Sequence, residues 1–178
     1  MELHLRTNQL SSLMTQSNPS PLSERELVLV RETHVSREKL YAGWTTAELL
    51  PKWFCPKPWY VSDVKLDLRP GGASDMMFHG PNGESFPNKG VYLELIPNEK
   101  IVFTSAFQAD WEPSPQTDVA TDFMFVGKLL FEPLPNGGTR YTARVVHWTK
   151  EACDKHKAMG FEQGWGIAFD QLVELVGK

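Results

Sequence analysis

Two histidines and a cysteine near the C-terminus are residue types that could bind a metal ion. Cys153 and His156 stand three residues apart, which places both on one face of a helix, and His147 precedes them on a predicted strand. Zinc sites use three or four such ligands in a closed geometry. The sequence offers no second pair with ligand spacing, and lysines flank this one. We therefore expect a solvated helix face here, with no metal and no cofactor.

Cysteine nucleophiles are the second kind of chemistry that the sequence could support. Cys55 lies in a proline-rich segment and Cys153 near the start of the last predicted helix. Neither stands in a recognisable motif that would lower its thiol pKa. We expect two buried or half-buried thiols, neither of them a nucleophile nor part of a disulfide framework.

General acid–base catalysis inside an apolar cavity is a third possibility. Asp75, His79, Glu94 and His147 all fall on predicted strands. A carboxylate that points inward without a partner would have a raised pKa, which suits a general base near neutral pH. Several of these strands carry apolar residues on both faces, so the alternation of side chains does not tell which residue points inward. The alternative for each is an outward, solvated side chain.

Aromatic and large apolar side chains are the most prominent candidate binding groups. They fall on elements that should line a space between a sheet and a helix, where they form either the wall of a ligand cavity or a filled core. A ligand would be apolar or aromatic, with Tyr60, Glu94 or His147 as polar anchors. The predicted wall consists of Trp53, Phe54, Tyr60, Met76, Phe78, Tyr92, Phe103, Phe125, Trp165 and Phe169.

The elements that position these residues are mostly strands joined by short turns. Such short links require antiparallel neighbours, because a parallel crossover needs a dozen or more residues. The strongest hairpin signal is Pro135-Asn136-Gly137-Gly138. After the first strand, Ser36 and Thr45 offer N-caps for two short helices, 37–44 and one that Pro51 ends or bends. The seven predicted strands span 26–35, 59–68, 73–79, 90–96, 100–107, 121–134 and 138–148.

The C-terminal segment predicts one long helix. Its apolar residues recur at helical spacing from Phe161 to Val176, although three glycines, Gly160, Gly164 and Gly166, lie within the predicted helical segment 150–176. These glycines indicate either a close approach of the helix to the sheet or a deliberately open space. One amphipathic helix that covers one face of an antiparallel sheet is an α+β arrangement. We expect a curved sheet of about seven strands wrapped round this helix, with an internal cavity.

Composition excludes several classes of function. The 178 residues carry 18 basic and 22 acidic side chains, a net charge of -4. Nucleic acid is therefore not an expected partner, and no apolar run is long enough to insert into a membrane.

The first 23 residues lack a signal-peptide core and are expected to be a flexible leader without function, with Met14 a possible true start. We expect a single domain over residues 24–178 in the cytoplasm.

Four segments in order resemble a known family. They are VSREKLYAGWTTAELLPKWF, DLRPGGASDMMFHGPNGE, GVYLELIPNEKIVFT and AMGFEQGWGIAFDQLVELV, and the resemblance spans about residues 26–176. The sequence resembles bacterial homologues of the activator of the heat-shock-protein ATPase (Aha-type), within the START-like (SRPBCC) superfamily. It departs from that family at Val35-Ser36, Trp53-Phe54 and Ser74, which alters the expected pocket volume. No relative's ligand is therefore carried over to this chain.

The resemblance implies a helix-grip fold, similar to that of the Bet v allergens, and a set of alternative functions. The first expectation is a domain that binds a small hydrophobic or lipid-like ligand without a catalytic constellation. The second is an enzyme similar to the polyketide cyclases and aromatases. The third is a chaperone co-factor acting in the stress response, which is less favoured because the short leader cannot be the additional N-terminal domain of the eukaryotic activators. A homodimer is also expected, since apolar residues lie on the uncovered face of the sheet.

Overall fold

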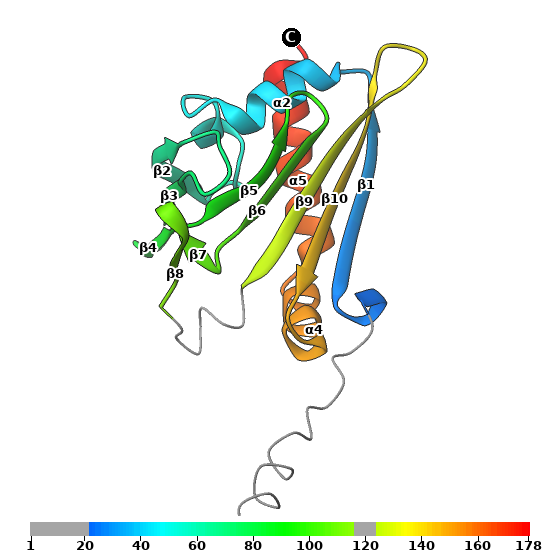
Figure 1. Cartoon of the computed structure of the whole chain (residues 1–178). Helices are drawn as coiled ribbons and strands as arrows, with labels where there is room; N and C mark the ends of the chain where they lie inside the picture. The colour runs from blue at the N-terminus through cyan, green and yellow to red at the C-terminus, as the bar shows by residue number, and fades with distance from the viewer. Residues whose placement is uncertain (1–21, 116–123) are drawn as a thin grey trace, which may run out of the picture.

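A five-stranded antiparallel sheet is the framework of the structure, a computed structural model that describes residues 22–115 and 124–178 (Figure 1). β1 forms one edge, and every neighbouring pair is antiparallel, as the short turns predicted for the two pairs that they join. The leader residues 1–21 and the first three residues of the predicted strand 121–134 lie outside the described residues. In spatial order the strands are β1 Glu26–Thr33, β10 Thr139–His147, β9 Phe125–Pro133, β6 Lys100–Thr104 and β5 Val91–Ile96.

A second, three-stranded antiparallel sheet continues the first one beyond β5. A single bridge between Ala73 and Val91 links the two sheets, so the predicted sheet of about seven strands is divided at this point. Its strands are β2 Tyr60–Leu66, β3 Ser74–His79 and β4 Ser85–Asn88, and β4 was not predicted. A further pair of two-residue strands was also not predicted. β7 Phe107–Gln108 pairs with β8 Glu112–Pro113, and the 3-10 helix η4 Ala109–Trp111 lies between them.

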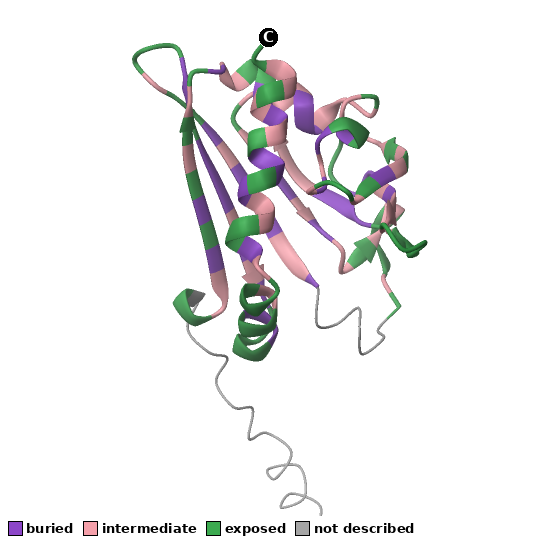
Figure 2. Ribbon diagram, turned by 180° about the vertical axis from the view of Figure 1, so that it is seen from behind, coloured by how far each residue is buried: buried purple, intermediate pink, exposed green. Residues whose placement is uncertain are grey.

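Helices cover one face of the five-stranded sheet, which confirms the predicted α+β, helix-grip arrangement. The C-terminal helix α5 Phe161–Val176 lies along this face, and its buried side turns to the strands (Figure 2). On β1, Leu27 and Leu29 are buried beneath it, whereas Val28 and Val30 on the outer face are 46% and 47% exposed. The other helices are η2 Leu22–Glu24, α2 Arg37–Thr45, η3 Leu50–Lys52 and α4 Lys150–Ala158.

The predicted C-terminal helix is interrupted, and Gly160 is the reason. Its φ of 91° lies in the left-handed region, which a glycine adopts at little cost because it has no Cβ. The chain therefore ends α4, turns, and begins α5 at Phe161. Gly164 and Gly166 remain inside α5, as predicted. The break allows α4 to contact β10 while α5 follows the sheet.

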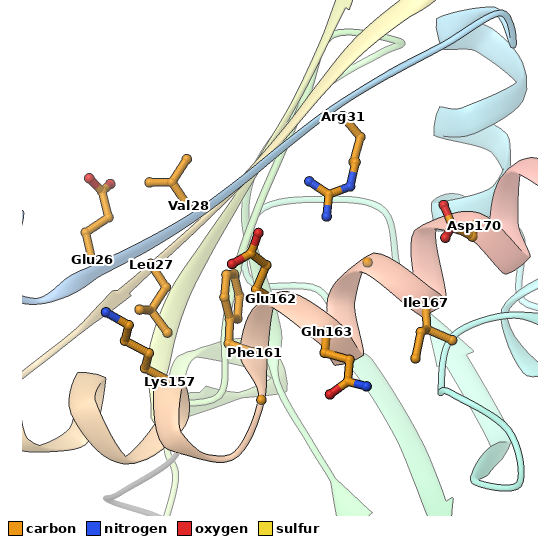
Figure 3. A pocket seen from close by; sticks show the side chains of 12 residues that line it. Glu26, Leu27, Val28, Arg31, Lys157, Phe161, Glu162, Gln163, Ile167 and Asp170 are labelled. Atoms are coloured by element: carbon orange, nitrogen blue, oxygen red, sulfur yellow. The ribbon is translucent and has the colours of Figure 1, made fainter.

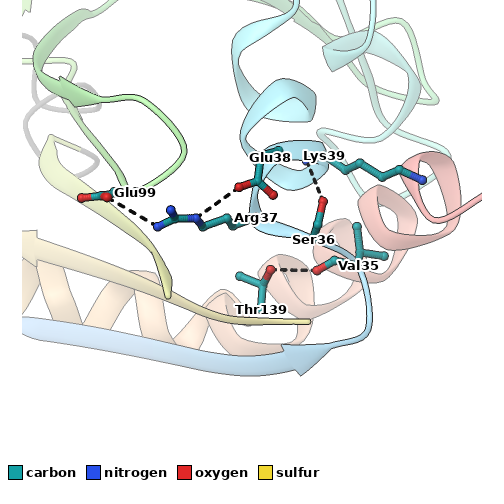
Figure 4. A network of polar contacts seen from close by, with 7 residues as sticks. All are labelled: Val35, Ser36, Arg37, Glu38, Lys39, Glu99 and Thr139. Carbon is teal, nitrogen blue, oxygen red and sulfur yellow. Dashed lines mark hydrogen bonds and ion pairs between the residues drawn. The ribbon is translucent and has the colours of Figure 1, made fainter. Parts of the chain in front are cut away.

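The short helix α2 forms where its N-cap predicted it. The Ser36 side chain accepts a hydrogen bond from the Lys39 amide, which satisfies one of the free N–H groups of the first turn (Figure 4). Beside it, the buried Thr139 hydroxyl donates to the Val35 carbonyl at 2.7 Å and ties β10 to the segment before α2. The second predicted helix is reduced to a turn followed by η3, in which Pro51 occupies a first-turn position.

Candidate functional site

Five aromatic rings form a continuous belt between the helices and the sheet. Each touches the next, with ring-centroid distances of 5.6, 6.3, 6.2 and 6.4 Å in order along the belt. They come from five different parts of the chain: the segment after η3, α2, β6, β9 and α5. We call these residues the aromatic belt: Phe54, Trp44, Phe103, Phe125 and Trp165.

The belt differs from an ordinary core in its exposure. Trp44 is buried, but Phe54, Phe103, Phe125 and Trp165 are each only partly buried and pack against the main core cluster. Solvent therefore reaches part of each of these four residues. A partly exposed run of touching rings is a surface on which an apolar molecule can pack. Trp44 was not among the predicted wall residues, because it lies on a short helix whose buried face the sequence does not mark clearly.

Gly127 on β9 gives the Phe103 ring its place in the belt. The two residues are opposite each other on neighbouring strands, and a Cβ at Gly127 would lie 2.5 Å from the tip of the Phe103 ring. The ring therefore lies directly over the glycine backbone. Any larger residue at this position would force the ring to move away from the sheet.

Other members of the predicted wall are parts of the packed core. Trp53, Tyr92 and Phe169 belong to the main buried cluster, and Met76 belongs to a smaller one. The Trp53 indole donates to the Gly43 carbonyl at 3.0 Å, so its polar atom is satisfied within the protein. At these four positions the side chains fill space, which was the alternative interpretation of the pattern.

Two further wall residues lie on the three-stranded sheet, outside the belt. The Phe78 ring contacts Phe54 at 6.0 Å and stacks on the exposed Phe86 at 5.4 Å, so it extends the belt toward the surface. Tyr60 differs from the expectation, since it is 52% exposed and stacks on His79 at 4.7 Å on the other face of this sheet. Tyr60 is the first residue of its strand. Successive side chains of a strand point to opposite faces, so a shift of one residue in the expected alternation moves Tyr60 from the inner face to the outer face.

The predicted acidic groups are engaged elsewhere. The Glu94 carboxylate forms an ion pair with Lys100 Nζ at 2.6 Å, and its side chain is 46% exposed, so the structure does not place it as an inward anchor. A register shift in β5 between Tyr92 and Glu94 accounts for this change of side. Asp75 Oδ1 accepts from the Gly90 amide at 3.3 Å and thereby helps to join the two sheets.

His79 forms a hydrogen bond with a serine, although the pair lacks the form of a nucleophilic site. Its Nε2 lies 2.8 Å from Ser62 Oγ, and that hydroxyl also donates to Asp63 Oδ2 at 2.8 Å. A serine hydroxyl has one proton, so the histidine must donate to Ser62 and cannot act as its base in this arrangement.

His147 and His156 form a hydrogen-bonded pair at one end of the belt. His147 Nε2 lies 2.9 Å from His156 Nδ1, and His147 Nδ1 lies 3.3 Å from the Arg25 carbonyl. A carbonyl only accepts, which makes His147 Nδ1 the donor there and assigns the proton between the rings to His156 Nδ1. Both ring nitrogens of His147 are thus hydrogen-bonded. The remaining ring nitrogen of the pair is Nε2 of His156, a residue that the sequence indicated only as a metal ligand.

Burial keeps this pair neutral. Desolvation is the main cause that lowers the pKa of His156 to about 4, with a contribution from nearby His147. Desolvation also lowers the pKa of His147, against a hydrogen bond to the Arg25 carbonyl that raises it. The His156 ring stacks on Phe125 at 5.5 Å, which joins the pair to the belt. At neutral pH this end of the belt therefore carries no charge.

The cysteines and the predicted metal-binding set give no reactive centre among residues 22–115 and 124–178. Burial raises the pKa of the Cys55 thiol to about 12 and also raises that of Cys153, and both thiols are free and buried. Within these residues, no group of three or more His, Cys, Asp or Glu side chains is arranged to hold a metal ion. Nor does the described part of the chain contain a helix with the length and apolarity to cross a membrane.

Two hollows on the described surface have no belt residue in their lining. The larger is a groove of ≈ 770 Å³ between edge strand β1 and helix α5, where Leu27, Phe161 and Ile167 lie among charged side chains such as Arg31 and Glu162 (Figure 3). The smaller, near the start of α2, has a volume of ≈ 230 Å³. Neither is lined by any of the ten predicted wall residues, so the expected cavity is not one of these hollows.

Comparison with solved structures supports the same fold. A protein from Nitrosomonas europaea is 37% identical, with a TM-score of 0.80 over 87% of this chain and 96% of that one. A Mycobacterium smegmatis protein (22% identity, TM-score 0.70, 88% and 93% coverage) and the AHSA1 protein of Silicibacter pomeroyi (18%, 0.61, 85% and 97%) share the fold. No functionally curated protein matches the sequence.

The family is decided by a match over most of the chain. The family described as "Activator of Hsp90 ATPase homolog 1-like protein" matches residues 34–177. This range covers α2, the three-stranded sheet, the C-terminal helices and every strand of the five-stranded sheet except β1. It includes all four sequence segments that carried the resemblance. The chain therefore belongs to the Activator of Hsp90 ATPase homolog 1-like family, as its sequence motifs indicated.

Proposed function

We propose that this domain binds a small apolar or aromatic molecule against the aromatic belt, without a dedicated catalytic constellation. The observation that carries the proposal is the partial exposure of Phe54, Phe103, Phe125 and Trp165, which touch one another or Trp44 across the interior. Covering such rings removes apolar surface from water, which contributes about 25 cal/mol per Å².

Ligand entry requires rings to move, and the belt is suited to this. Phe54 follows a 3-10 helix in a proline-rich segment, and Phe78 connects it to the exposed Phe86. Edge-to-face contacts such as that between Phe125 and Trp165 are worth only about 0.5–1.5 kcal/mol beyond their buried area. A planar ligand that inserts between two rings would replace these contacts with similar ones.

Binding rather than catalysis is favoured by the state of the predicted polar anchors. Glu94 is paired with Lys100, and both nitrogens of His147 are already hydrogen-bonded. A general base needs a free lone pair within hydrogen-bond reach of its substrate. His156 Nε2 is the remaining candidate, and turnover that is lost in a His156→Asn variant would favour the cyclase-like alternative instead.

The test is a fluorescence titration with N-phenyl-1-naphthylamine, a neutral apolar probe. We expect saturable binding, weakened about tenfold in Trp165→Leu, because a ring of the belt is lost. Trp148→Leu is the matched control, since Trp148 is 51% exposed and lies outside the belt. Absence of binding, or equal affinity in both variants, would overturn the proposal. Native mass spectrometry of protein from its own host would then identify the natural ligand.

The description of the family suggests a competing experiment. It names an activator of the Hsp90 ATPase, so the ATPase rate of the host's own chaperone should be measured with and without this protein. A rate unchanged by a saturating amount of the protein is expected if ligand binding is the function. Stimulation of the ATPase that persists when Trp165 is replaced would instead favour the chaperone co-factor.

A further inference from the structure

The edge strand β1 leaves one side of the five-stranded sheet open (Figure 1). The opposite edge strand, β5, is continued toward the three-stranded sheet by the bridge between Ala73 and Val91. Among the described residues, no strand pairs with the outer side of β1. β1 pairs with β10 over all eight of its residues without a bulge, and it contains no proline, glycine or lysine. A long, straight edge without these features is a template for another strand.

The main-chain groups of alternate residues of β1 point to this open side. The His147 amide of β10 donates to the Arg25 carbonyl just before β1, and the register continues from there. Because bonded and non-bonded residues alternate in an antiparallel pair, every second residue turns its N–H and C=O away from β10. The contact of Arg31 agrees with this, since its Nη1 donates to the Val30 carbonyl at 2.9 Å. The outward-facing residues are Glu26, Val28, Val30 and Glu32.

The side chains of these residues form a short pattern that is apolar in the middle and acidic at both ends. Val28 and Val30 on the outer face are 46% and 47% exposed. Glu26 and Glu32 lie on either side of them, and each forms an ion pair at 2.8 Å with an arginine of β10. The two valines are therefore flanked by carboxylates whose charge is already balanced within the chain.

We propose that two copies of this chain pair along β1, antiparallel about a two-fold axis, with Leu29 of one copy opposite Leu29 of the other. The outward-facing main-chain groups then meet one another, and each Val28 lies opposite Val30 of the second copy. A shift of two residues in either direction would place one valine opposite a glutamate, so this register matches the side chains best. The homodimer expected from the sequence would thus form at the edge of the sheet, independently of the aromatic belt.

The groove between β1 and α5, with a volume of ≈ 770 Å³, runs along the same edge (Figure 3). A surface that carries both signs of charge suits a copy of itself, whereas a strongly acidic or basic partner would meet like charges. In the proposed register Arg31 lies opposite Leu27 of the second copy. Val30 accepts there from the main chain of the second copy, which frees the Arg31 guanidinium to pair with a carboxylate such as Glu162 across the axis. The charged residues of the groove are Glu26, Arg31, Lys157, Glu162 and Asp170.

The test is sedimentation equilibrium of the full chain over a range of protein concentrations. We expect a reversible dimer. Replacing both valines, Val28→Lys with Val30→Lys, should weaken it at least about tenfold, because like charges then lie opposite each other across the axis. Ile96→Lys is the matched control, since Ile96 is 38% exposed on β5 at the opposite edge, and it should leave the association unchanged. Circular dichroism of both variants shows whether the fold is retained.

Hydrogen exchange in the unmodified ¹⁵N-labelled chain, read by NMR, gives a second measurement that needs no variant. The amides of Val28 and Val30 point to the open side, whereas those of Leu27 and Leu29 point to β10. We expect all four amides to be protected at high protein concentration. On dilution below the dissociation constant, Val28 and Val30 should lose their protection, and Leu27 and Leu29 should keep it.

Every other result overturns the proposal. A monomer at all concentrations with fast exchange at Val28 and Val30 would leave the edge open to a strand from another protein. A monomer in which these amides stay protected would show that another part of this chain covers β1. A dimer that the two lysines do not weaken would use a different surface. None of these results bears on the proposed function, because no residue of the aromatic belt lies on β1.

Discussion

Acidification should destabilise the protein through the His147–His156 pair. Burial holds the pKa of His156 at about 4, compared with an ordinary value of 6.5. The unfolded chain therefore binds more protons between these two values, and stability falls as the pH decreases from about 6.5 to about 4. At 1.36 kcal/mol per pKa unit the loss has an upper limit of about 3 kcal/mol, and partial exposure of the ring reduces our expectation to about 2 kcal/mol.

Urea unfolding at a series of pH values measures this loss. The decisive variant is His156→Asn, because the asparagine amide can still donate toward His147 Nε2 but does not titrate. We expect it to remove most of the decrease in unfolding free energy between pH 6.5 and 4.5. His34→Asn is the control at an exposed histidine and should retain the decrease. If His156→Asn shows the same decrease as the unmodified chain, the pair is not buried and neutral as argued above.

Two further predictions concern glycines, both measured as changes in the free energy of unfolding. Gly164→Ala should stabilise the protein by roughly 0.5–1 kcal/mol, because the new Cβ inside α5 meets nothing closer than 4.0 Å. Gly160→Ala should destabilise it by about 1 kcal/mol or more, because the φ of 91° at this position is unfavourable for any residue with a Cβ. Equal effects of the two substitutions would contradict the left-handed conformation of Gly160 between α4 and α5. Gly127→Ala should destabilise the protein by about 1–3 kcal/mol and alter the binding of N-phenyl-1-naphthylamine, because the Phe103 ring must move. An unchanged free energy of unfolding would show that the ring does not lie over this glycine.

Local signals determined much of the fold, and this explains which elements were predicted. Turn residues such as Pro135 to Gly138 specify hairpins directly, and the β9–β10 pairing follows in register. The Ser36 cap likewise sets the start of α2. Gly160 was assigned to the helix interior, because a helical pattern of apolar residues continues on both sides of it. Its left-handed conformation depends on where α4 and α5 pack, which no local signal contains.

The candidate site was predicted less completely because bulges break the alternation on which such a prediction depends. Register shifts between Ser62 and Lys65 in β2 and between Tyr92 and Glu94 in β5 change which side chains face the helices. The sequence alone does not locate these shifts. Trp44 was overlooked for a different reason: its place between Phe54 and Phe103 depends on how α2 packs, a property of three-dimensional surroundings rather than of residue type.

The two interpretations of the aromatic residues, ligand wall or filled core, apply to different members of the set. Trp53, Tyr92 and Phe169 are buried, and their polar atoms or ring faces are matched within the protein. Four of the belt residues, Phe54, Phe103, Phe125 and Trp165, are left partly exposed, whereas Trp44 between them is buried. The saturable binding of N-phenyl-1-naphthylamine, and its weakening in Trp165→Leu but not in Trp148→Leu, is therefore the measurement that separates a binding surface from a filled core.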